Sequence, residues 1–421
     1  MKYIIILINK QSERNACLME NVFKDYSANI HHPAWENISK RKKTLPTNPG
    51  DIRSVFDRDY TRIIHSNAYK RLKHKTQVFF SPESDHICTR SEHVSHVESI
   101  SYTIASYLGL NTELTKAIAV AHDIGHSPFG HSGEKILSTI SQRDLGCSFW
   151  HEKNGLEFVD KIELLENKDR YKDNLDLTYA VRDGIISHCG EIDENCLKPR
   201  KEYIDLTSYV RPNQYAPYTW EGCVVKISDK ISYIGRDIED AITLGIIDEH
   251  LDELYKLLHY DLPEKKINNT IIINYLVCDL AKNSTPEKGL CFSEEAFDLL
   301  NKIKEFNYRN IYFSDRLKPS ITYFELVLNE IYGTLKSCYD GENTIITLRN
   351  KLSKISIKLY DSFLGFLTNY YDLGNRQELK LVNDVIFDFH NEKDFYQCIL
   401  YYISRMTDKF AIEIYNDIIG F

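Results

Sequence analysis

The chain has 421 residues, of which 43% are hydrophobic and 27% charged, a composition typical of a globular protein rather than a disordered or fibrous one. Glycine (18) and proline (11) are both used less than average, which favours long helices and disfavours an all-β barrel or sandwich. The net charge of -9 excludes a global positive field that would bind nucleic acid or an anionic membrane, so any phosphate site must be a local pocket.

The hydrophobic runs and the cysteines of the sequence indicate the cellular location of the protein. The opening run at residues 3–8 is shorter than a signal-peptide core of about 7 to 15 residues. No stretch approaches the roughly 20 apolar residues of a spanning helix. The 10 cysteines are scattered without a Cys-x-x-Cys pair, unlike a disulfide framework or a zinc knuckle. We therefore expect a cytoplasmic protein with no membrane segment and mostly buried, unpaired cysteines.

The first clear boundary lies near residue 50. Residues 39–51 combine a basic run with Pro46 and Pro49, as linkers often do. Beyond this segment, apolar residues recur at helical spacing. We predict an N-terminal extension and linker over 1–50, a main domain over 51–245 and a C-terminal helical region over 246–421 that packs on it.

Two helices of the main domain are well marked. Asn111 is a good N-cap, and the residues after it are apolar almost all round until Gly125 and Pro128, which predicts a buried helix. A second helix is predicted over 222–244, with an apolar stripe at spacings of three and four. Further helices are predicted over 251–258, 294–306, 323–335, 348–371 and 395–419.

Histidines concentrate between residues 86 and 151, a segment that holds seven of the 15 in the chain. The sharpest piece is HDIGHSPFGHSGE at 122–134. Asp123 lies at the end of the apolar helix, where a carboxylate must be paired, hydrogen-bonded or metal-bound. Its neighbour His122 favours the metal.

Partners for a metal must come from other helices. His93 is in line with Val97 and Ile100 on an amphipathic helix and so points toward the core, although a hydrogen-bonded core histidine is the simpler reading of one such residue. Asp229, with Tyr233 and Asp237, shares the helix face opposite the apolar stripe. A solvated face is the alternative reading of that group.

Several motifs follow one another along the chain. They are RDYTRIIHS at 58–66, RLKHKTQVF at 71–79, Thr89-Arg90 before His93, HDIGHSPFGHSGE at 122–134, His151-Glu152, DKISY at 229–233 and MTDKFA at 406–411. In this order the motifs resemble the HD-domain phosphohydrolases, and within them the deoxyguanosinetriphosphate triphosphohydrolase-like proteins. The resemblance is strong over 51–245 and returns at 400–420. It implies an all-α fold, an HD-domain helical fold with additional C-terminal helices.

The resemblance also implies a metal site. Its four ligands would be His93, His122, Asp123 and Asp229. Two imidazoles and two carboxylates suit Mn²⁺, Mg²⁺, Fe²⁺ or Zn²⁺, and such a metal polarises a phosphoryl oxygen and helps to generate a hydroxide nucleophile. The chain departs from the usual family pattern after His93, so His96, one turn along, is an alternative ligand or a residue that supports the ligands from behind.

The remaining site residues follow from the same resemblance. His131 and Glu134, spaced i and i+3, form the expected acid/base pair, in which the carboxylate fixes the tautomer of the imidazole. A helix pair without a catalytic part is the alternative. The expected triphosphate ligands are Arg90, His126, His151, Lys230 and Tyr233. The expected sugar contacts are Gln77 and Asp237, which would bind the 3′-hydroxyl.

The implied reaction is attack of water at the α-phosphorus of a deoxynucleoside triphosphate, which releases the deoxynucleoside and tripolyphosphate in one step. The sequence contains no Gly-x-Ser-x-Gly elbow, which would indicate a covalent nucleophile. It also contains no Walker loop, which would indicate a different kind of phosphate site. A guanine preference, a homo-oligomeric assembly and allosteric binding of a deoxynucleotide or single-stranded DNA are expectations from the resemblance alone.

Two other functions remain open at this point. One is an HD phosphohydrolase or nucleotidase of other specificity. The other is a nucleotide-sensing or nucleic-acid-binding protein that retains an HD site, because one basic stretch could contact phosphates. That stretch holds Arg53, Arg58, Arg62, Lys70, Arg71, Lys73 and Lys75.

Overall fold

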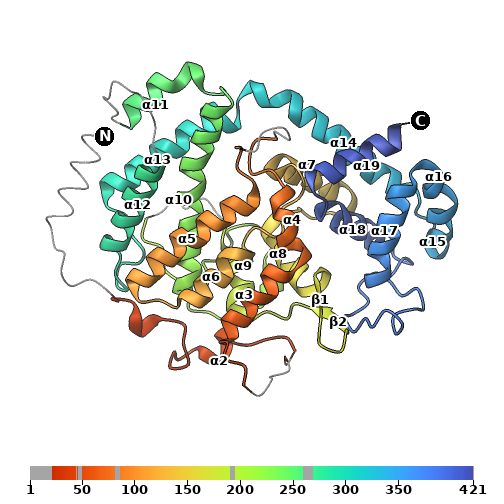
Figure 1. Cartoon of the computed structure of the whole chain (residues 1–421), viewed down its shortest axis with the longest axis horizontal. Helices are drawn as coiled ribbons and strands as arrows, with labels where there is room; N and C mark the ends of the chain where they lie inside the picture. Colours follow the sequence, from red (N-terminus) through yellow and green to blue (C-terminus); the bar gives the residue numbers. More distant parts are fainter. Residues whose placement is uncertain are drawn as a thin grey trace.

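The computed structural model describes residues 21–43, 45, 50–80, 86–189, 195–258 and 269–420, so the run at 3–8 lies outside the described residues. Over this part of the chain the fold is all-α, as predicted (Figure 1). Its one sheet in the described ranges is a small antiparallel pair, β1 (Leu164–Glu166) and β2 (Lys172–Asn174). None of the described helices is long and apolar enough to cross a membrane.

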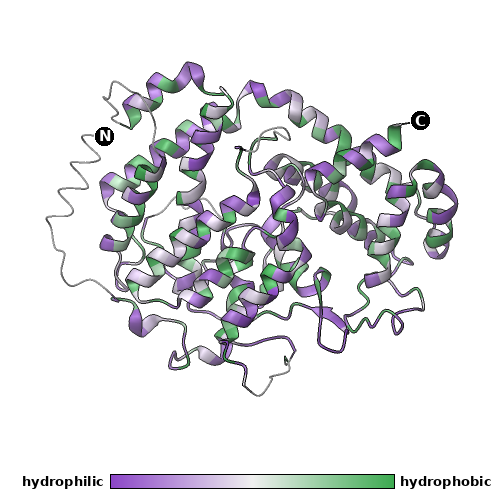
Figure 2. Ribbon diagram, viewed as in Figure 1, coloured by the Kyte–Doolittle hydropathy of each residue, from purple (hydrophilic) through white to green (hydrophobic). Residues whose placement is uncertain are grey.

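The centre of the molecule is built from helices, most of which carry or border the motifs. These are α3 (Val55–His65), α5 (Arg90–Leu108), α6 (Thr112–Ala121), α7 (Gly130–Leu145), α8 (His151–Glu157), α9 (Tyr179–Ser187) and α10 (Trp220–Thr243). Helix α6 packs against α3, α5, α9 and α10, which explains why it is apolar almost all round. Most helices around it carry apolar residues on one side and polar ones on the other (Figure 2).

Local signals set the starts of the site helices. The Asn111 side chain accepts hydrogen bonds from the backbone N–H groups of Glu113 and Leu114, so the predicted N-cap is confirmed. Helix α5 begins with a capping box formed by Thr89 and Glu92. Helix α10 matches the helix predicted over 222–244, but Asp237 on its polar face is only 2% exposed, so that face is not solvated there.

The C-terminal helices form two groups on either side of this centre in Figure 1. On one side, α12 (Asn269–Asn283) and α13 (Glu294–Asn307) pack on α10. On the other, α14 (Lys318–Lys336) and α18 (Glu392–Ser404) pack on α7. The remaining helices are α2 (Trp35–Ile38), α4 (Asn67–Arg71), α11 (Leu251–Leu257), α15 (Thr344–Thr347), α16 (Ser353–Ile355), α17 (Ile357–Tyr370) and α19 (Asp408–Ile419).

Two predicted C-terminal helices are interrupted in the structure. The helix expected over 348–371 is broken at Ser356, where the backbone is extended. The side chain of Ser356 caps α17 by accepting a hydrogen bond from the N–H of Leu359. The helix expected over 395–419 is broken between α18 and α19, where Thr407 caps α19 by accepting from the N–H of Phe410. Serine and threonine favour such caps, and the apolar periodicity continues across both breaks.

Residues 21–43 lie against the main domain. Phe23, Ala28 and Ile38 are buried in its cores. Arg41, within the predicted linker, pairs with the buried Asp59 at 2.6 Å. This part of the predicted extension therefore contributes to the packed core.

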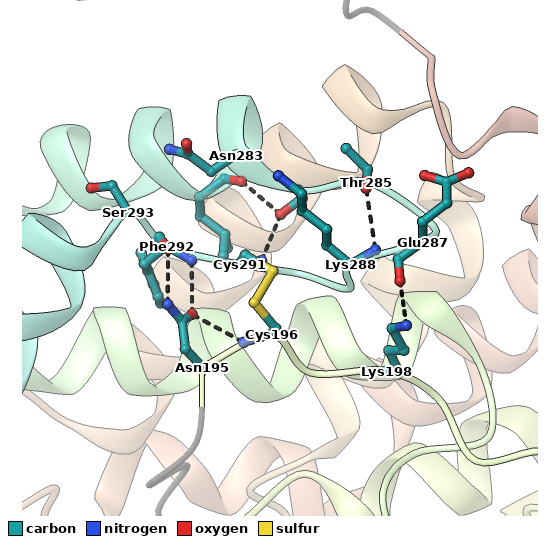
Figure 3. The surroundings of a disulfide bond; sticks show 12 residues. Asn195, Cys196, Lys198, Asn283, Thr285, Glu287, Lys288, Cys291, Phe292 and Ser293 are labelled. Atoms are coloured by element: carbon teal, nitrogen blue, oxygen red, sulfur yellow. Dashed lines mark hydrogen bonds between the residues drawn. A yellow bond between two sulfur atoms is a disulfide. The ribbon is translucent and has the colours of Figure 1, made fainter.

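One disulfide, Cys196–Cys291, joins the segment before α10 to the connection between α12 and α13 (Figure 3). Asn195 reinforces the junction, because its side chain accepts from the N–H of Phe292 and donates to the carbonyl of the same residue. The scattered cysteines did not predict this bond, since its two residues are 95 positions apart. Of the described unpaired cysteines, four are buried as expected, whereas Cys147 is exposed.

Candidate active site

Three helices bring the four predicted metal ligands together. His93 comes from α5, His122 and Asp123 follow α6, and Asp229 lies on α10. The Nε2 atom of His93 is 2.9 Å from Oδ1 of Asp229. The Nε2 atom of His122 is 3.8 Å from the same oxygen and 3.7 Å from Oδ1 of Asp123. These donor atoms surround one small volume.

The hydrogen bonding of His122 prepares it to hold a cation. Its Nδ1 lies 2.7 Å from the carbonyl oxygen of Ala119, so Nδ1 carries the proton and donates it. Its Nε2 is buried and has no hydrogen-bond partner in the described residues. A buried nitrogen lone pair that faces two carboxylates fits a divalent metal, because the ion would satisfy all three groups.

Both carboxylates of this cluster are held in the charged form. Burial would raise the pKa of Asp123, but Arg90, whose Nη1 is 2.7 Å from Oδ2, and His126 and His122 hold that pKa well below its usual range. Burial likewise opposes ionisation of Asp229, and its hydrogen bond with His93 lowers the pKa to about 2. Neutral pH therefore leaves two negative charges at the candidate metal position.

His93, and not His96, faces Asp229. Among the described residues, the groups of side chains with metal-ligand spacing include His93 and omit His96. His96 is half-buried one turn along α5. This arrangement favours His93 over His96 as the metal ligand, the two alternatives that the sequence left open.

Close backbone packing shapes the loop between α6 and α7. A Cβ atom on Gly125 would lie 2.1 Å from the carbonyl oxygen of His151, so only glycine permits α8 to approach the loop this closely. Phe129 has a positive φ of 63°, which turns the chain into α7. The two features set the position of His126, the histidine between them.

The C-terminal motif at 406–411 supports the same loop. Asp408 accepts from the backbone N–H of Phe129 through Oδ1 and from that of Thr76 through Oδ2. The buried Lys75 donates to the carbonyls of His126 and Ser404. A motif almost 300 residues away thus holds the loop in place, which gives the MTDKFA segment a structural role.

Glu134 lies between two histidines. Its Oε2 is 2.9 Å from Nδ1 of His151 and 3.7 Å from Nδ1 of His131. The His131 side chain is 69% exposed, whereas that of His151 is buried. The predicted His131–Glu134 proximity is present, but the shorter contact of the carboxylate is with His151.

The rings of the two histidines predicted to bind phosphate lie against each other at an interplanar angle of 31°. The ring centroids of His126 and His151 are 3.7 Å apart. Burial lowers the pKa of His151, but Glu152 and Glu134 outweigh it and raise that pKa to about 9. Burial and Arg90 lower the pKa of His126 well below its usual value. At neutral pH the pair therefore carries one positive charge.

The other predicted phosphate ligands lie on α5 and α10. Arg90 is buried, with Nη1 on Asp123 and Nη2 donating to the carbonyl of Gln77 at 3.3 Å. Lys230 is buried next to Asp229 and lines a pocket bordered by Cys196. Tyr233 is half-buried one turn further along the helix. The structure thus brings Arg90 into contact with the metal cluster and places Lys230 at a pocket that Cys196 also lines.

The residues predicted to contact the sugar are buried. Gln77 is 6% exposed, and its Oε1 has no hydrogen-bond partner in the described residues. Asp237 accepts a hydrogen bond from the hydroxyl of Tyr312, on the π turn Tyr308–Tyr312 that follows α13. Sequence reasoning missed Tyr312, since it is 75 positions from Asp237 and belongs to no motif identified above.

The sequence also matches known proteins. Residues 90–234 match the HD domain. A deoxyguanosinetriphosphate triphosphohydrolase-like protein of Caldanaerobacter subterraneus subsp. tengcongensis is 36% identical over 282 residues, which cover 67% of this chain and 72% of the relative. A protein of the same description from Rickettsia conorii is 30% identical over 91% of this chain and 96% of its own length. The chain belongs to this family.

Membership in the deoxyguanosinetriphosphate triphosphohydrolase-like family identifies the chain as a metal-dependent HD phosphohydrolase. The motif order and the all-α fold are those expected of the family. The buried cluster described above contains His and Asp side chains at the spacing of metal ligands.

The basic stretch at 53–75 is only partly exposed in the structure. Arg62 donates to the backbone carbonyls of Leu175 and Asn174. Arg71 pairs with the buried Glu163 at 2.6 Å. Lys75 is buried as described above. These three charged groups are engaged within the fold, whereas Arg53, Lys70 and Lys73 are exposed, so the stretch is not one continuous phosphate-contacting surface.

Proposed function

We propose that the protein hydrolyses deoxynucleoside triphosphates, with dGTP as the preferred substrate, to a deoxynucleoside and tripolyphosphate. The observation that carries this proposal is the convergence of the metal cluster with cationic groups. Arg90 touches Asp123 directly, and the His126–His151 pair lies beside it. A triphosphate needs such a combination of a cation and fixed hydrogen-bond donors. The printed names of the relatives support dGTP.

The metal ligands would be His93, His122, Asp123 and Asp229, and the ion would be Mn²⁺, Mg²⁺, Fe²⁺ or Zn²⁺. When bound, a divalent ion supplies Lewis-acid polarisation of a phosphoryl oxygen. Arg90 holds Asp123 in the charged form and orients it toward the ligand cluster. The residues therefore position the α-phosphoryl group for in-line attack by water without a covalent intermediate.

His131 is the group we assign to proton transfer. Its imidazole is exposed, so it can reach the 5′-oxygen of the departing deoxynucleoside, and Glu134 lies 3.7 Å from its Nδ1. The carboxylate favours the tautomer with the proton on Nδ1 and keeps Nε2 toward the substrate. Such contacts are often long before substrate binds, so this separation is compatible with the role.

Asp237 and Gln77 would bind the 3′-hydroxyl, and Tyr312 orients Asp237. We expect Asp237→Ala to lower kcat/KM for dGTP by up to about tenfold, the equivalent of one lost hydrogen bond. The variant also opens space beside the 2′-carbon, so the ratio of kcat/KM for dGTP over GTP should fall as well. The melting temperature should fall less markedly. The control is Glu239→Ala, an exposed position on the same helix, and an unchanged kcat/KM for dGTP in Asp237→Ala would exclude the sugar contact.

The charge on His151 predicts a pH dependence. Its ordinary pKa of 6.5 is raised to about 9 in the folded protein, so the positive charge is present at neutral pH and is lost as pH rises through about 9. We expect KM for the nucleotide to stay constant from pH 7 to 8 and to rise above pH 9. His151→Gln, which is neutral throughout, should have a raised KM without this step. A KM profile that is equally flat in the wild type would contradict the assignment.

The proposal is tested by incubating the protein with each of the four deoxynucleoside triphosphates and with GTP, in Mn²⁺ or Mg²⁺, and separating the products. Deoxyguanosine and intact tripolyphosphate are the expected products. Release of tripolyphosphate from another deoxynucleoside triphosphate instead would support the proposed reaction but assign a different base preference. Monophosphate with pyrophosphate would point instead to a nucleotidase-like HD enzyme.

A homo-oligomeric assembly, allosteric binding of a deoxynucleotide or single-stranded DNA, and a cytoplasmic location belong to the same proposal. They rest on the family resemblance and, for the location, on the sequence pattern. Size-exclusion chromatography coupled to light scattering tests the first of them directly.

A further inference from the structure

A histidine outside the motifs reaches the metal cluster. His188 directly follows α9, which packs on α6, α8 and α10, and it is only 2% exposed. It lies outside the histidine-rich segment at 86–151, and no role has been assigned to it above. Polar side chains buried to this extent normally have a binding partner.

The orientation of His188 matches that of His122. Nδ1 of His188 is 2.7 Å from the carbonyl oxygen of Ile185, three residues earlier, as Nδ1 of His122 is 2.7 Å from that of Ala119. Both rings therefore carry the proton on Nδ1. Both leave the lone pair of Nε2 available, which is the arrangement in which histidine binds a metal.

The position of His188 relative to the cluster also matches that of an assigned ligand. Its ring centroid is 5.0 Å from that of His122 at an interplanar angle of 76°, and the ring of His93 is 5.5 Å from His122 at 66°. One donor atom each from His122, Asp123 and His188 lie within 4.8 Å of one another, as do those from His93, His122 and Asp229. The two groups share His122, so they lie side by side.

We propose that His188 is a fifth protein ligand of the metal centre formed by His93, His122, Asp123 and Asp229. This inference rests on the metal site of the proposed function. Three imidazoles and two carboxylates favour Fe²⁺, Zn²⁺ or Mn²⁺ over Mg²⁺, because imidazole suits borderline transition metals and Mg²⁺ prefers oxygen ligands. The His188 ring is also 5.3 Å from that of His151, so the ligand lies on the side of the site that faces the predicted phosphate contacts.

Two substitutions separate a ligand from a purely structural residue. His188→Asn places its amide near the position of Nδ1, so it can keep the contact with Ile185 but lacks the atom at Nε2. His188→Gln reaches the position of Nε2 and loses the contact with Ile185. A ligand role predicts that His188→Asn weakens metal binding more than His188→Gln does, and a structural role predicts the reverse order.

The measurement is the Kd for Co²⁺ and Mn²⁺, obtained by titrating the metal-free full-length protein. We expect His188→Asn to raise Kd by about 10- to 100-fold, the range typical of groups that support or form a metal site. We expect a smaller rise for Mg²⁺. The control is His96→Gln on α5, which should leave Kd unchanged. An unchanged Kd in His188→Asn, or a larger effect in His188→Gln, would overturn the proposal.

A second measurement needs no variant and so does not depend on their folding. Electron–nuclear double resonance of the wild-type protein loaded with Mn²⁺, with its histidines labelled with ¹⁵N, counts the coordinated nitrogens. Nitrogens from His93, His122 and His188 would all be detected, whereas a spectrum with only two would overturn the inference. If the wild type binds metal yet cleaves no deoxynucleotide, the proposed function fails while the ligand assignment is still decided by these spectra.

Discussion

His122→Ala and Asp123→Ala, each made separately, are expected to abolish metal binding and hydrolysis together. His122 supplies the buried Nε2 atom that lacks a hydrogen-bond partner in the described residues, and Asp123 supplies a carboxylate held in the charged form by Arg90. Removing either group leaves an incomplete site and, with Asp123→Ala, a buried and unpaired Arg90. Metal content after dialysis, measured by mass spectrometry, and turnover of dGTP are the two readouts.

The control for both variants is again His96→Gln, which should retain metal and activity. A melting curve shows whether each variant is folded, because Asp123→Ala is expected to lose stability as well. Full activity in a folded variant that has lost its metal would rule out the metal-dependent mechanism.

The second large effect concerns His131. We expect His131→Ala to lower kcat by about 10²- to 10⁴-fold, the usual contribution of a positioned acid or base, with little change in metal content. Its side chain is 69% exposed, so its loss should cost little stability. The measurement is kcat for dGTP with the metal saturating.

Lys135→Ala is the matched control, since Lys135 is exposed on the same helix one turn away. It should keep kcat near the wild-type value. If His131→Ala also keeps it, the proton must come from another group, and His151, which makes the shorter contact with Glu134, becomes the first candidate.

Local patterns account for the parts that the sequence predicted. The N-cap at Asn111 and the apolar run after it fix helix α6, and the residues directly after that helix hold His122 and Asp123. Periodicity places Asp229 on α10. These features depend on neighbours within a few turns, so they can be read from one sequence.

Long-range packing decides what the sequence did not predict. Tyr312 meets Asp237 only because α13 packs on α10, and Cys196 meets Cys291 only because the connection after α12 returns to the segment before α10. His188 belongs to no periodic pattern that links it to His122. Which histidine Glu134 contacts also depends on the approach of α8, since spacing along α7 favours His131 alone.

The most direct test of the central claim is hydrolysis of dGTP in water enriched in ¹⁸O, with the metal present and both products analysed by mass spectrometry. Attack of water at the α-phosphorus places one ¹⁸O atom in tripolyphosphate and none in deoxyguanosine, and this is the result we predict. Label in the deoxyguanosine 5′-hydroxyl, or label in pyrophosphate or monophosphate with no tripolyphosphate formed, would contradict the account.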